Sequence, residues 1–399
     1  MQDNEKKPAL RFKGFTDPWE QRKLGVVFEE YSEKNHAELP PLTIIQGGGT
    51  IRRDESERAL QYDKSSLSNY KMVNKDDFIV HLRSFEGGLE KASSQGIISP
   101  AYHTFHGEDV DSRFYYAYFR SKKFINKDLK PHVYGIRDGR SIDIEGMKTI
   151  RIPWASYPEQ KSIGDFLTHL DTLITLHQRK YEKLVNIKKS MLDKMFPKNG
   201  ASVPEIRFKG FTAPWEQRKV GELLTERNEQ APMSDEYPLM AFIANEGVAP
   251  KGERYDRSAL VNDTASKLYK KTKFGDFIYS SNNLETGSIG LNKYGKASIS
   301  PVYSIFKPTG IADSDFLGRR LIRKDFINEM VKWRQGVIYG QWRIHESDFI
   351  KIEVAVPTVE EQCKLGLLLD NLDTLITLHQ RKLEKLQNIK KSCLEKMFV

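Results

Sequence analysis

The chain has 399 residues, of which 39% are apolar, so it can build one large or two to three ordinary domains and is not a disordered protein. Its 63 Lys and Arg residues exceed its 54 Asp and Glu residues, and the net charge of +9 suits a polyanionic partner without proving one. Cys363 and Cys393 are too few for a disulfide framework or a zinc cluster. The polar start and the lack of any apolar run of about 18 residues predict a cytoplasmic protein without a membrane span.

The chain is a tandem repeat with a period near 200 residues, about the size of a duplicated domain. Residues 11–25 (RFKGFTDPWEQRKLG) return at 207–221 with 13 identities in 15 positions. Residues 170–196 (LDTLITLHQRKYEKLVNIKKSMLDKMF) return at 372–398 with 23 identities in 27 positions. We call these four stretches the shared segments. The residues between them differ almost everywhere, which indicates one architecture that presents two different surfaces.

This pattern divides the chain into six parts. In chain order, we predict an N-terminal shared segment at 1–22, a variable segment at 23–155, a long helix at 156–198, a linker with a shared segment at 199–218, a variable segment at 219–357 and a long helix at 358–399.

Each variable segment is predicted to be an α+β unit, because short β-branched and aromatic runs alternate with Gly, Asn, Asp and Pro. The runs predict strands at 77–81, 96–98, 277–280 and 350–356, and helical patches at 112–126 and 314–328.

Both shared segments that end the repeats belong to long helices. From Ile163 and from Leu365, apolar residues recur at spacings of three and four without an internal proline. Each run opens with a Glu-Gln pair, Glu159-Gln160 or Glu361-Gln362, and predicts a helix roughly 50 Å long. Two such stripes in one chain favour pairing with each other. Because only about ten residues link the first helix to the second repeat, we expect an antiparallel coiled coil that separates two pseudo-symmetric α+β domains.

The search for catalytic chemistry gives negative results. The run Gly47-Gly48-Gly49 is followed by Thr-Ile-Arg-Arg and lacks the lysine and hydroxyl of a phosphate-binding loop, so it predicts a turn that needs free backbone angles. His177 and His379 fall in HQRK helix segments, where a ligand role is improbable. We find no methyltransferase tetrapeptide, no nuclease pattern and no nucleophile with a base. The sequence therefore predicts no catalytic residue and no metal ligand.

Polar clusters flanked by glycine recur at matching places in the two variable segments. Arg bonds guanine edges, and Asn or Gln bonds adenine edges, through paired hydrogen bonds. A single cluster is more often an ordinary surface loop. Because the clusters recur in both segments, DNA contact and ordinary surface loops are about equally good interpretations. The candidates are Gln46, Thr50, Arg52, Arg53, Arg83, Tyr134, Arg137, Arg140, Asn245, Lys251, Arg254, Asn282, Asn283, Tyr339, Gln341, Trp342 and Arg343.

The long helices also carry a basic strip. Its positions are Arg179, Lys180 and Lys183 in the first repeat and Arg381, Lys382 and Lys385 in the second. A solvated helix face and a strip that faces phosphate or an acidic partner are equally good interpretations.

The PWEQRK segments, the Glu-Gln helix starts and the LDTLITLHQRK helices together resemble the HsdS-like specificity subunit of Type I restriction-modification systems, over the whole chain. The resemblance implies two target recognition domains, each reading half of a bipartite, asymmetric DNA sequence, and a helix pair that sets the gap. It also implies a subunit without catalytic activity of its own. The chain would dock two modification subunits, which bind S-adenosylmethionine and methylate adenine. Through them it would dock restriction subunits, which use ATP and Mg. No cofactor is therefore expected in this chain.

Two other classes of function remain open at this stage. A methyltransferase or nuclease acting alone would need a cofactor loop that we do not find, and S-adenosylmethionine binding by the purified chain would support it. A scaffold that joins proteins without DNA is disfavoured by the charge and by the divergent polar loops. A salt-dependent gel shift on duplex DNA distinguishes this scaffold from a DNA reader.

Overall fold

The computed structural model describes residues 7–56, 64–81, 89–134, 141–198, 200–250, 267–338 and 341–398. The chain forms two compact units. The first unit comprises Met1–Lys180 with His379–Val399, and the second comprises Tyr181–Leu378. Each unit therefore contains one variable segment together with part of both long helices, and the predicted limits of the six segments stay predictions.

The first unit is built on a four-stranded antiparallel sheet in the order β2-β9-β6-β7. Short strand pairs and helices surround this sheet. The sheet strands are β2 (Glu29–Tyr31), β9 (His103–His106), β6 (Phe78–Val80) and β7 (Glu90–Lys91). The pairs are β1 (Glu20–Lys23) with β12 (Arg151–Trp154), β3 (Leu42–Ile45) with β4 (Gly49–Arg52), β5 (Lys71–Val73) with β8 (Gly96–Ile98), and β10 (Val133–Tyr134) with β11 (Ser141–Ile142). The helices are α1 (Leu24–Val27), α2 (Ser112–Phe119), the π-helix η4 (Phe124–Leu129), α3 (Ile144–Lys148) and α4 (Tyr157–Lys194), with short 3-10 turns at η2 (Arg53–Glu55), η3 (Lys64–Asn69) and η5 (Lys130–His132).

The second unit repeats this plan with a sheet in the order β14-β22-β19-β20. Its sheet strands are β14 (Leu224–Glu226), β22 (Ser304–Pro308), β19 (Phe277–Tyr279) and β20 (Ile289–Leu291). Around them lie β13 (Glu216–Lys219) with β25 (Glu353–Val356), β16 (Ala241–Ile243) with β17 (Gly247–Ala249), β15 (Gln230–Ala231) with β18 (Tyr269–Thr272) and β21 (Ala297–Ile299), and β23 (Gln335–Ile338) with β24 (Gln341–Arg343). The helices are α5 (Val220–Leu223), α6 (Ser314–Arg320), α7 (Lys324–Val331), α8 (Glu346–Phe349) and α9 (Val359–Met397). The predicted α+β class is confirmed.

Each predicted helical patch of the variable segments is divided in two. The first breaks between α2 and η4, and the second breaks between α6 and α7. Phe119 and Phe124 explain the first break, because their ring centroids lie 4.9 Å apart and both are fully buried. In one continuous helix, residues five apart would point about 140° away from each other. The core contact therefore requires the backbone to turn after α2.

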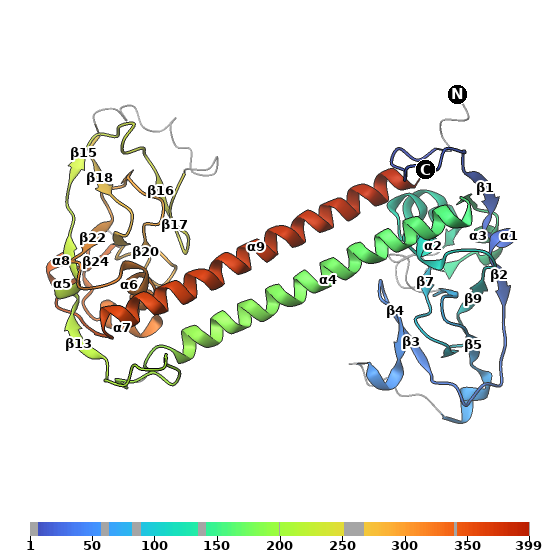
Figure 1. The fold of residues 1–399 in the computed structure, drawn as a ribbon, viewed down its shortest axis with the longest axis horizontal. Helices are drawn as coiled ribbons and strands as arrows, with labels where there is room; N and C mark the ends of the chain where they lie inside the picture. The colour runs from blue at the N-terminus through green and yellow to red at the C-terminus, as the bar shows by residue number, and fades with distance from the viewer. Residues whose placement is uncertain are drawn as a thin grey trace. The chain divides into compact units, whose positions relative to one another are not determined.

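The long helices α4 and α9 have 38 and 39 residues, so each is about 57 Å long at 1.5 Å per residue. Within the first unit they run antiparallel (Figure 1), because Lys390 pairs with Asp171 while His379 contacts His177. In both units the helices contribute to the main hydrophobic core, with Leu167 and Phe398 in the first and Leu365 in the second. The prediction of an antiparallel helix pair is confirmed. No described helix is apolar enough over 18 residues to cross a membrane.

The shared segments fasten each unit to the start of its long helix. The guanidinium of Arg11 donates two hydrogen bonds, of 2.6 and 2.8 Å, to the carboxylate of Glu159, which is 1% exposed. Trp19 Nε1 donates a third at 3.0 Å. Arg207 binds Glu361 in the same way, with two bonds of 2.7 Å. Hydrogen bonding to these carboxylates raises the pKa of both arginines.

The glutamine after each buried glutamate makes a second matching attachment. Gln160 accepts the backbone N–H of Asp111 at 3.0 Å, and Gln362 accepts that of Asp313 at 2.9 Å. Both aspartates cap the next helix, α2 or α6, through their side chains. The repeated residues thus hold the same helices at the same register in both units. The two units therefore have the same attachments to the long helices and differ in the loops between their strands.

Candidate nucleic-acid interface

Two equivalent hairpins, β3–β4 and β16–β17, carry predicted polar clusters. The second strand of each begins with a glycine at positive φ, Gly49 at 75° and Gly247 at 90°. A Cβ on either would lie 2.7 Å from a backbone carbonyl, that of Lys91 or Leu291. Only glycine fits these positions without strain. Gly47 also has a φ of 77°, which confirms that the glycine run forms a turn that needs free backbone angles.

In the first unit, the hairpin turn is held by the buried carboxylate of Glu90. This carboxylate accepts the backbone N–H groups of Gly47 and Gly49 at 2.7 and 3.2 Å. It also accepts the hydroxyl of Tyr116 at 2.8 Å and pairs with Arg120 at 2.6 Å. Burial, with the nearby Glu90 charge, raises the pKa of Tyr116. The turn is therefore attached to helix α2.

In the second unit, the corresponding turn rests on the loop between β19 and β20. Asn245 adopts a φ of 64°, and its backbone N–H donates to the carbonyl of Gly287 at 3.0 Å. That loop also contains Asn282 and Asn283, whose side chains are exposed. The Asn283 carbonyl accepts the N–H of Ser288 at 2.9 Å, which fixes the loop backbone. Three candidate asparagines therefore lie on two loops that touch.

A hollow of about 510 Å³ lies next to these loops in the second unit. We call it the loop hollow. It brings together three candidates from different parts of the sequence, Asn282, Trp342 and Arg343. Its other lining residues include Lys270, Ser281, Val302, Tyr303 and Glu346. An aromatic ring beside amide and guanidinium donors can contact the edge or face of a base.

Hydrogen bonds hold the wall of the loop hollow in place. The hydroxyl of Ser281 accepts the backbone N–H of Ile344 at 3.0 Å, next to Arg343. Ser304 donates to the carboxylate of Glu346 at 2.7 Å. Although burial opposes it, this bond and the nearby cations lower the pKa of Glu346. The exposed Trp342 and Arg343 thus project from a fixed support.

In the first unit, the candidate Tyr134 is 55% exposed. In the same unit, His81 lies against Tyr102 with ring centroids 4.9 Å apart. Tyr102 and Tyr303 follow the Ser-Pro pairs that both repeats share, at Ser99-Pro100 and at Ser300-Pro301. Our sequence-based candidates omitted both tyrosines. Their matched position, two residues after each Ser-Pro, was the signal that could have identified them.

Two candidates of the first hairpin, Thr50 and Arg53, have structural partners. Thr50 is 2% exposed, and its hydroxyl accepts the backbone N–H of Ser93 at 3.0 Å, so its side chain is not available to a base. Arg53 donates to the Leu42 carbonyl and stacks on the ring of Tyr70, within 5.3 Å. These two side chains stabilise the hairpin.

The remaining candidates have different surroundings. Gln46 is exposed, and Arg52 is exposed with an ion pair to Asp54 at 2.8 Å. All six positions of the helix basic strip are exposed. Only the backbone of Gln341, in β24, is described. The candidates that lie outside the described residues are Arg83, Arg137, Arg140, Lys251, Arg254 and Tyr339. DNA contact stays a prediction for all of these residues.

Within the described ranges, no three His, Cys, Asp or Glu side chains are grouped as a metal ion would require. Residues 17–186 match the family model described as the Type I restriction modification DNA specificity domain. This stretch, which lies mostly in the first unit, is therefore similar to that DNA specificity domain. The second unit repeats its shared segments and its sheet order, so the architecture of this domain occurs twice.

Solved structures resemble almost the whole chain. A Type I restriction-modification S subunit from M. genitalium matches with 14% identity and a TM-score of 0.57, covering 98% of this chain and 99% of the other. An HsdS subunit from Thermoanaerobacter tengcongensis matches with 16% identity and a TM-score of 0.44, covering 97% and 98%. The chain therefore shares the fold of the S subunit from M. genitalium. Together with the domain match, this confirms the prediction of a DNA-binding, HsdS-like specificity subunit.

Proposed function

We propose that this specificity subunit reads a bipartite, asymmetric DNA sequence, one half with each unit. The observation that carries the proposal is the contrast within the repeat. The two units share their sheet order and their attachments to the long helices, while the loops at the equivalent hairpins differ in residues and in support. Base readout requires such variable side chains on a fixed scaffold.

Exchange of one unit tests independent reading. Residues 23–154 would be replaced by the corresponding segment of a relative, leaving Arg11, Glu159 and both long helices unchanged. Methylated adenines would then be mapped across the genome of a strain that carries the chimaera. We expect one half of the target to change while the other half and the gap are kept. If both halves changed together, independent reading would be wrong.

We propose that the length of the helix pair sets the gap between the two halves. Four residues are close to one helical turn, so inserting four near Asn186 and four near Asn388 would lengthen both helices by about 6 Å and keep their apolar faces in phase. Because each base pair adds about 3.4 Å, the spacer should grow by one or two base pairs. An unchanged spacer in the folded, lengthened protein would assign the gap to another subunit.

The subunit is proposed to supply sequence choice and no chemistry, acting in the cytoplasm. Two modification subunits would carry S-adenosylmethionine and methylate adenine, and restriction subunits would hydrolyse ATP with Mg. The purified chain should then shift duplex DNA in a salt-dependent manner while neither methylating nor cutting it. Methylation or cleavage by the chain alone would refute this proposal, and failure to bind DNA at low salt would favour the scaffold alternative.

A further inference from the structure

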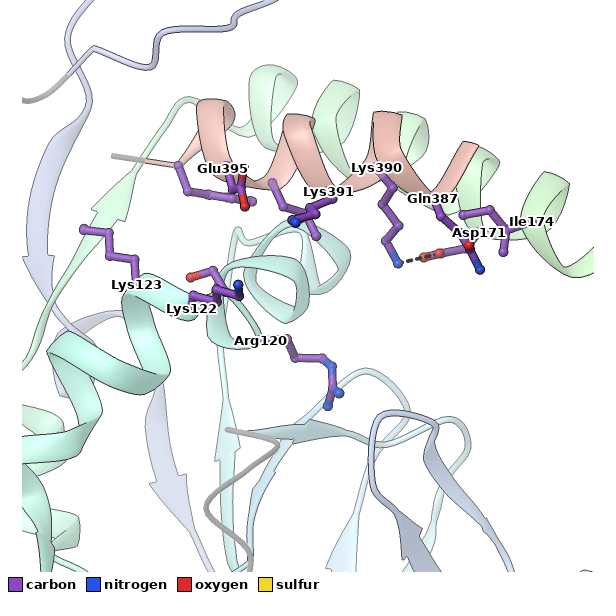
Figure 2. Close-up of a pocket in the computed structure, with 12 residues that line it drawn as sticks. Arg120, Lys122, Lys123, Asp171, Ile174, Gln387, Lys390, Lys391 and Glu395 are labelled. Atoms are coloured by element: carbon purple, nitrogen blue, oxygen red, sulfur yellow. Dashed lines mark hydrogen bonds and ion pairs between the residues drawn. The ribbon is translucent and has the colours of Figure 1, made fainter. Parts of the chain in front are cut away.

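A second hollow, of about 560 Å³, lies in the first unit. We call it the basic hollow. Its walls come from the segment after α2, from the first half of α4 and from the end of α9 (Figure 2). Five cations and two carboxylates line it, and its floor is apolar. The cations are Arg120, Lys122, Lys123, Lys390 and Lys391, and the floor is formed by Ile174, Leu394 and Phe398.

Two of these cations are available to a ligand. Arg120 pairs with Glu90, and Lys390 pairs with Asp171. Lys122 and Lys391 are exposed, and neither forms an ion pair with another described residue. Lys122 belongs to the segment after α2 and Lys391 to α9, so the two ammonium groups approach the hollow from opposite walls (Figure 2).

The second unit shows what occupies the equivalent place there. Helices α2 and α6 align through their Asp caps, Asp111 and Asp313, which makes Arg323 the counterpart of Ser121. The guanidinium of Arg323 lies 4.9 Å from the ring centre of Phe196 and donates to the carbonyl of Leu192. A planar donor group from the chain itself thus covers this aromatic ring.

The first unit keeps the aromatic ring and the helix carbonyl but lacks that guanidinium, and Tyr118, in the place of Arg320, adds a ring 5.6 Å from Phe398. Phe398 and Leu394 are the counterparts of Phe196 and Leu192 in the repeated helix. Phe398 packs with Trp19 as Phe196 packs with Trp215. Ser121 is too short to reach over the ring, and its hydroxyl instead accepts the N–H of Phe124 at 3.2 Å. Phe398 is 7% exposed and Phe196 is 1% exposed, so the replacement of arginine by serine leaves part of the ring of Phe398 open to the basic hollow.

A ligand of this hollow should combine a planar group that has hydrogen-bond donors with negative charge. The planar part would take the place that Arg323 fills in the second unit, over Phe398 and near the carbonyl of Leu394. The anionic part would lie between Lys122 and Lys391. Hollows of this volume hold small molecules, and an apolar floor with a few charged groups is typical of their sites.

We propose that the basic hollow binds a nucleoside phosphate, with the base on Phe398 and the phosphate between Lys122 and Lys391. A base presents a flat face and N–H donors, and phosphate oxygens accept charge-assisted bonds from ammonium groups. The site lies outside the loops assigned to DNA reading, so it goes beyond the proposed function.

Calorimetric titration of the purified full chain tests the proposal. The titrants would be AMP and ATP. Adenosine would test the contribution of the base alone, and inorganic pyrophosphate would test that of the phosphate alone. We expect both nucleotides to bind more tightly than either half alone. No binding of any nucleotide at millimolar concentration would overturn the proposal.

Two variants locate the site. The double change Lys122→Ala with Lys391→Ala should weaken AMP binding by about tenfold or more, because two charge-assisted bonds are lost, and should leave adenosine binding nearly unchanged. Lys324→Ala with Lys189→Ala alters the equivalent exposed lysines of the second unit and serves as the matched control. Equal effects of the two pairs would overturn the proposal.

A third variant, Ser121→Arg, imports the arginine of the second unit. It should abolish binding of both AMP and adenosine, because the side chain would cover Phe398. If this buried position does not tolerate arginine, the lysine pairs still decide the question. Titration of AMP in the presence of duplex DNA then separates two sources of the ligand. Competition assigns the hollow to a nucleotide of DNA, and independent binding assigns it to a free nucleotide.

Discussion

The two units agree closely in their attachments to the long helices, and much less in what holds their hairpin turns. Arg11 with Glu159 and Arg207 with Glu361 form the same two-bond pair, with distances that agree within 0.1 Å. The hairpin turns agree only in their backbone: one is held by the side chain of Glu90 and the other by a backbone bond to Gly287. The protein therefore keeps what positions a unit and varies what the unit presents.

Removing a buried glutamate should have the largest effect on stability. Glu159→Ala or Glu361→Ala leaves a guanidinium without its carboxylate, and we expect the free energy of unfolding to fall by about 3–5 kcal/mol. Urea denaturation followed by circular dichroism measures it. The neighbouring Glu360 is exposed, so Glu360→Ala should cost less than about 0.5 kcal/mol. If Glu361→Ala cost no more than Glu360→Ala, the attachment would not stabilise the unit.

Adding a methyl group in the hairpins tests the backbone that both units share. Gly49→Ala and Gly247→Ala force an L-residue to positive φ against a carbonyl 2.7 Å away, so each should cost about 1–3 kcal/mol in unfolding free energy. Gly14 has a φ of 102° with no atom within 4 Å of its Cβ position. Gly14→Ala therefore isolates the cost of φ alone. Equal losses at all three positions would show that the close carbonyls do not matter.

Exposed aromatic residues should separate the two reading surfaces. Trp342→Ala should weaken binding to one half of the target by about 1–3 kcal/mol, and Tyr134→Ala should weaken binding to the other half by a similar amount. Gel shifts on duplexes altered in one half at a time measure this, once methylation mapping has identified the target. Unchanged melting temperatures serve as the folding control. A loss that follows the same half for both variants would contradict separate reading.

The smallest effect is expected from the histidine pair of the long helices. Nδ1 of His177 lies 2.8 Å from Nδ1 of His379, so one of these nitrogens must accept. Partial burial, followed by the charge on His177, Lys180 and Lys382, lowers the pKa of His379 from its ordinary value of 6.5.

Linkage gives the direction of this pH effect. Between pH 6.5 and the lowered pKa of His379, the unfolded chain binds a proton at this histidine more readily than the folded chain does. The free energy of unfolding should therefore decrease as the pH falls from 6.5 toward that pKa. The melting temperature measured across it should drop less in His379→Gln than in the parent protein. The exposed His169 supplies the control variant His169→Gln, and an equal reduction of the drop in both variants would contradict the assignment to His379.

Periodicity predicted the long helices because their apolar stripe continues over nine turns with no proline. It did not predict the break after Phe119, because that break depends on ring packing in three dimensions. Glu159 and Gln160 were predicted only as helix openers. Their pairing with Arg11 and Asp111 spans up to 148 residues, although the repetition of all these residue types in both copies was a usable signal.

The candidate site was predicted less completely than the fold. Residue type and glycine flanks suggested Thr50 and Arg53 as readily as Asn282, since burial and local hydrogen bonding are not visible in a loop motif. The basic hollow had no motif at all. It depends on a serine in the first repeat at the position where the second repeat has an arginine. The effect of this difference can be recognised only when the structure shows Phe398 and Phe196 beside these two positions.

The attachments also bear on how new specificities arise. Residues 170–196 and 372–398 are almost identical, so two nearly identical stretches of the chain flank the second variable segment. A crossover between two such genes within these stretches would deliver an entire second unit, with Arg207 and Glu361 already matched. If each unit reads one half of the target, as proposed, one genetic exchange would produce a folded protein with one new half-target, whereas point mutations would have to alter several loops in turn.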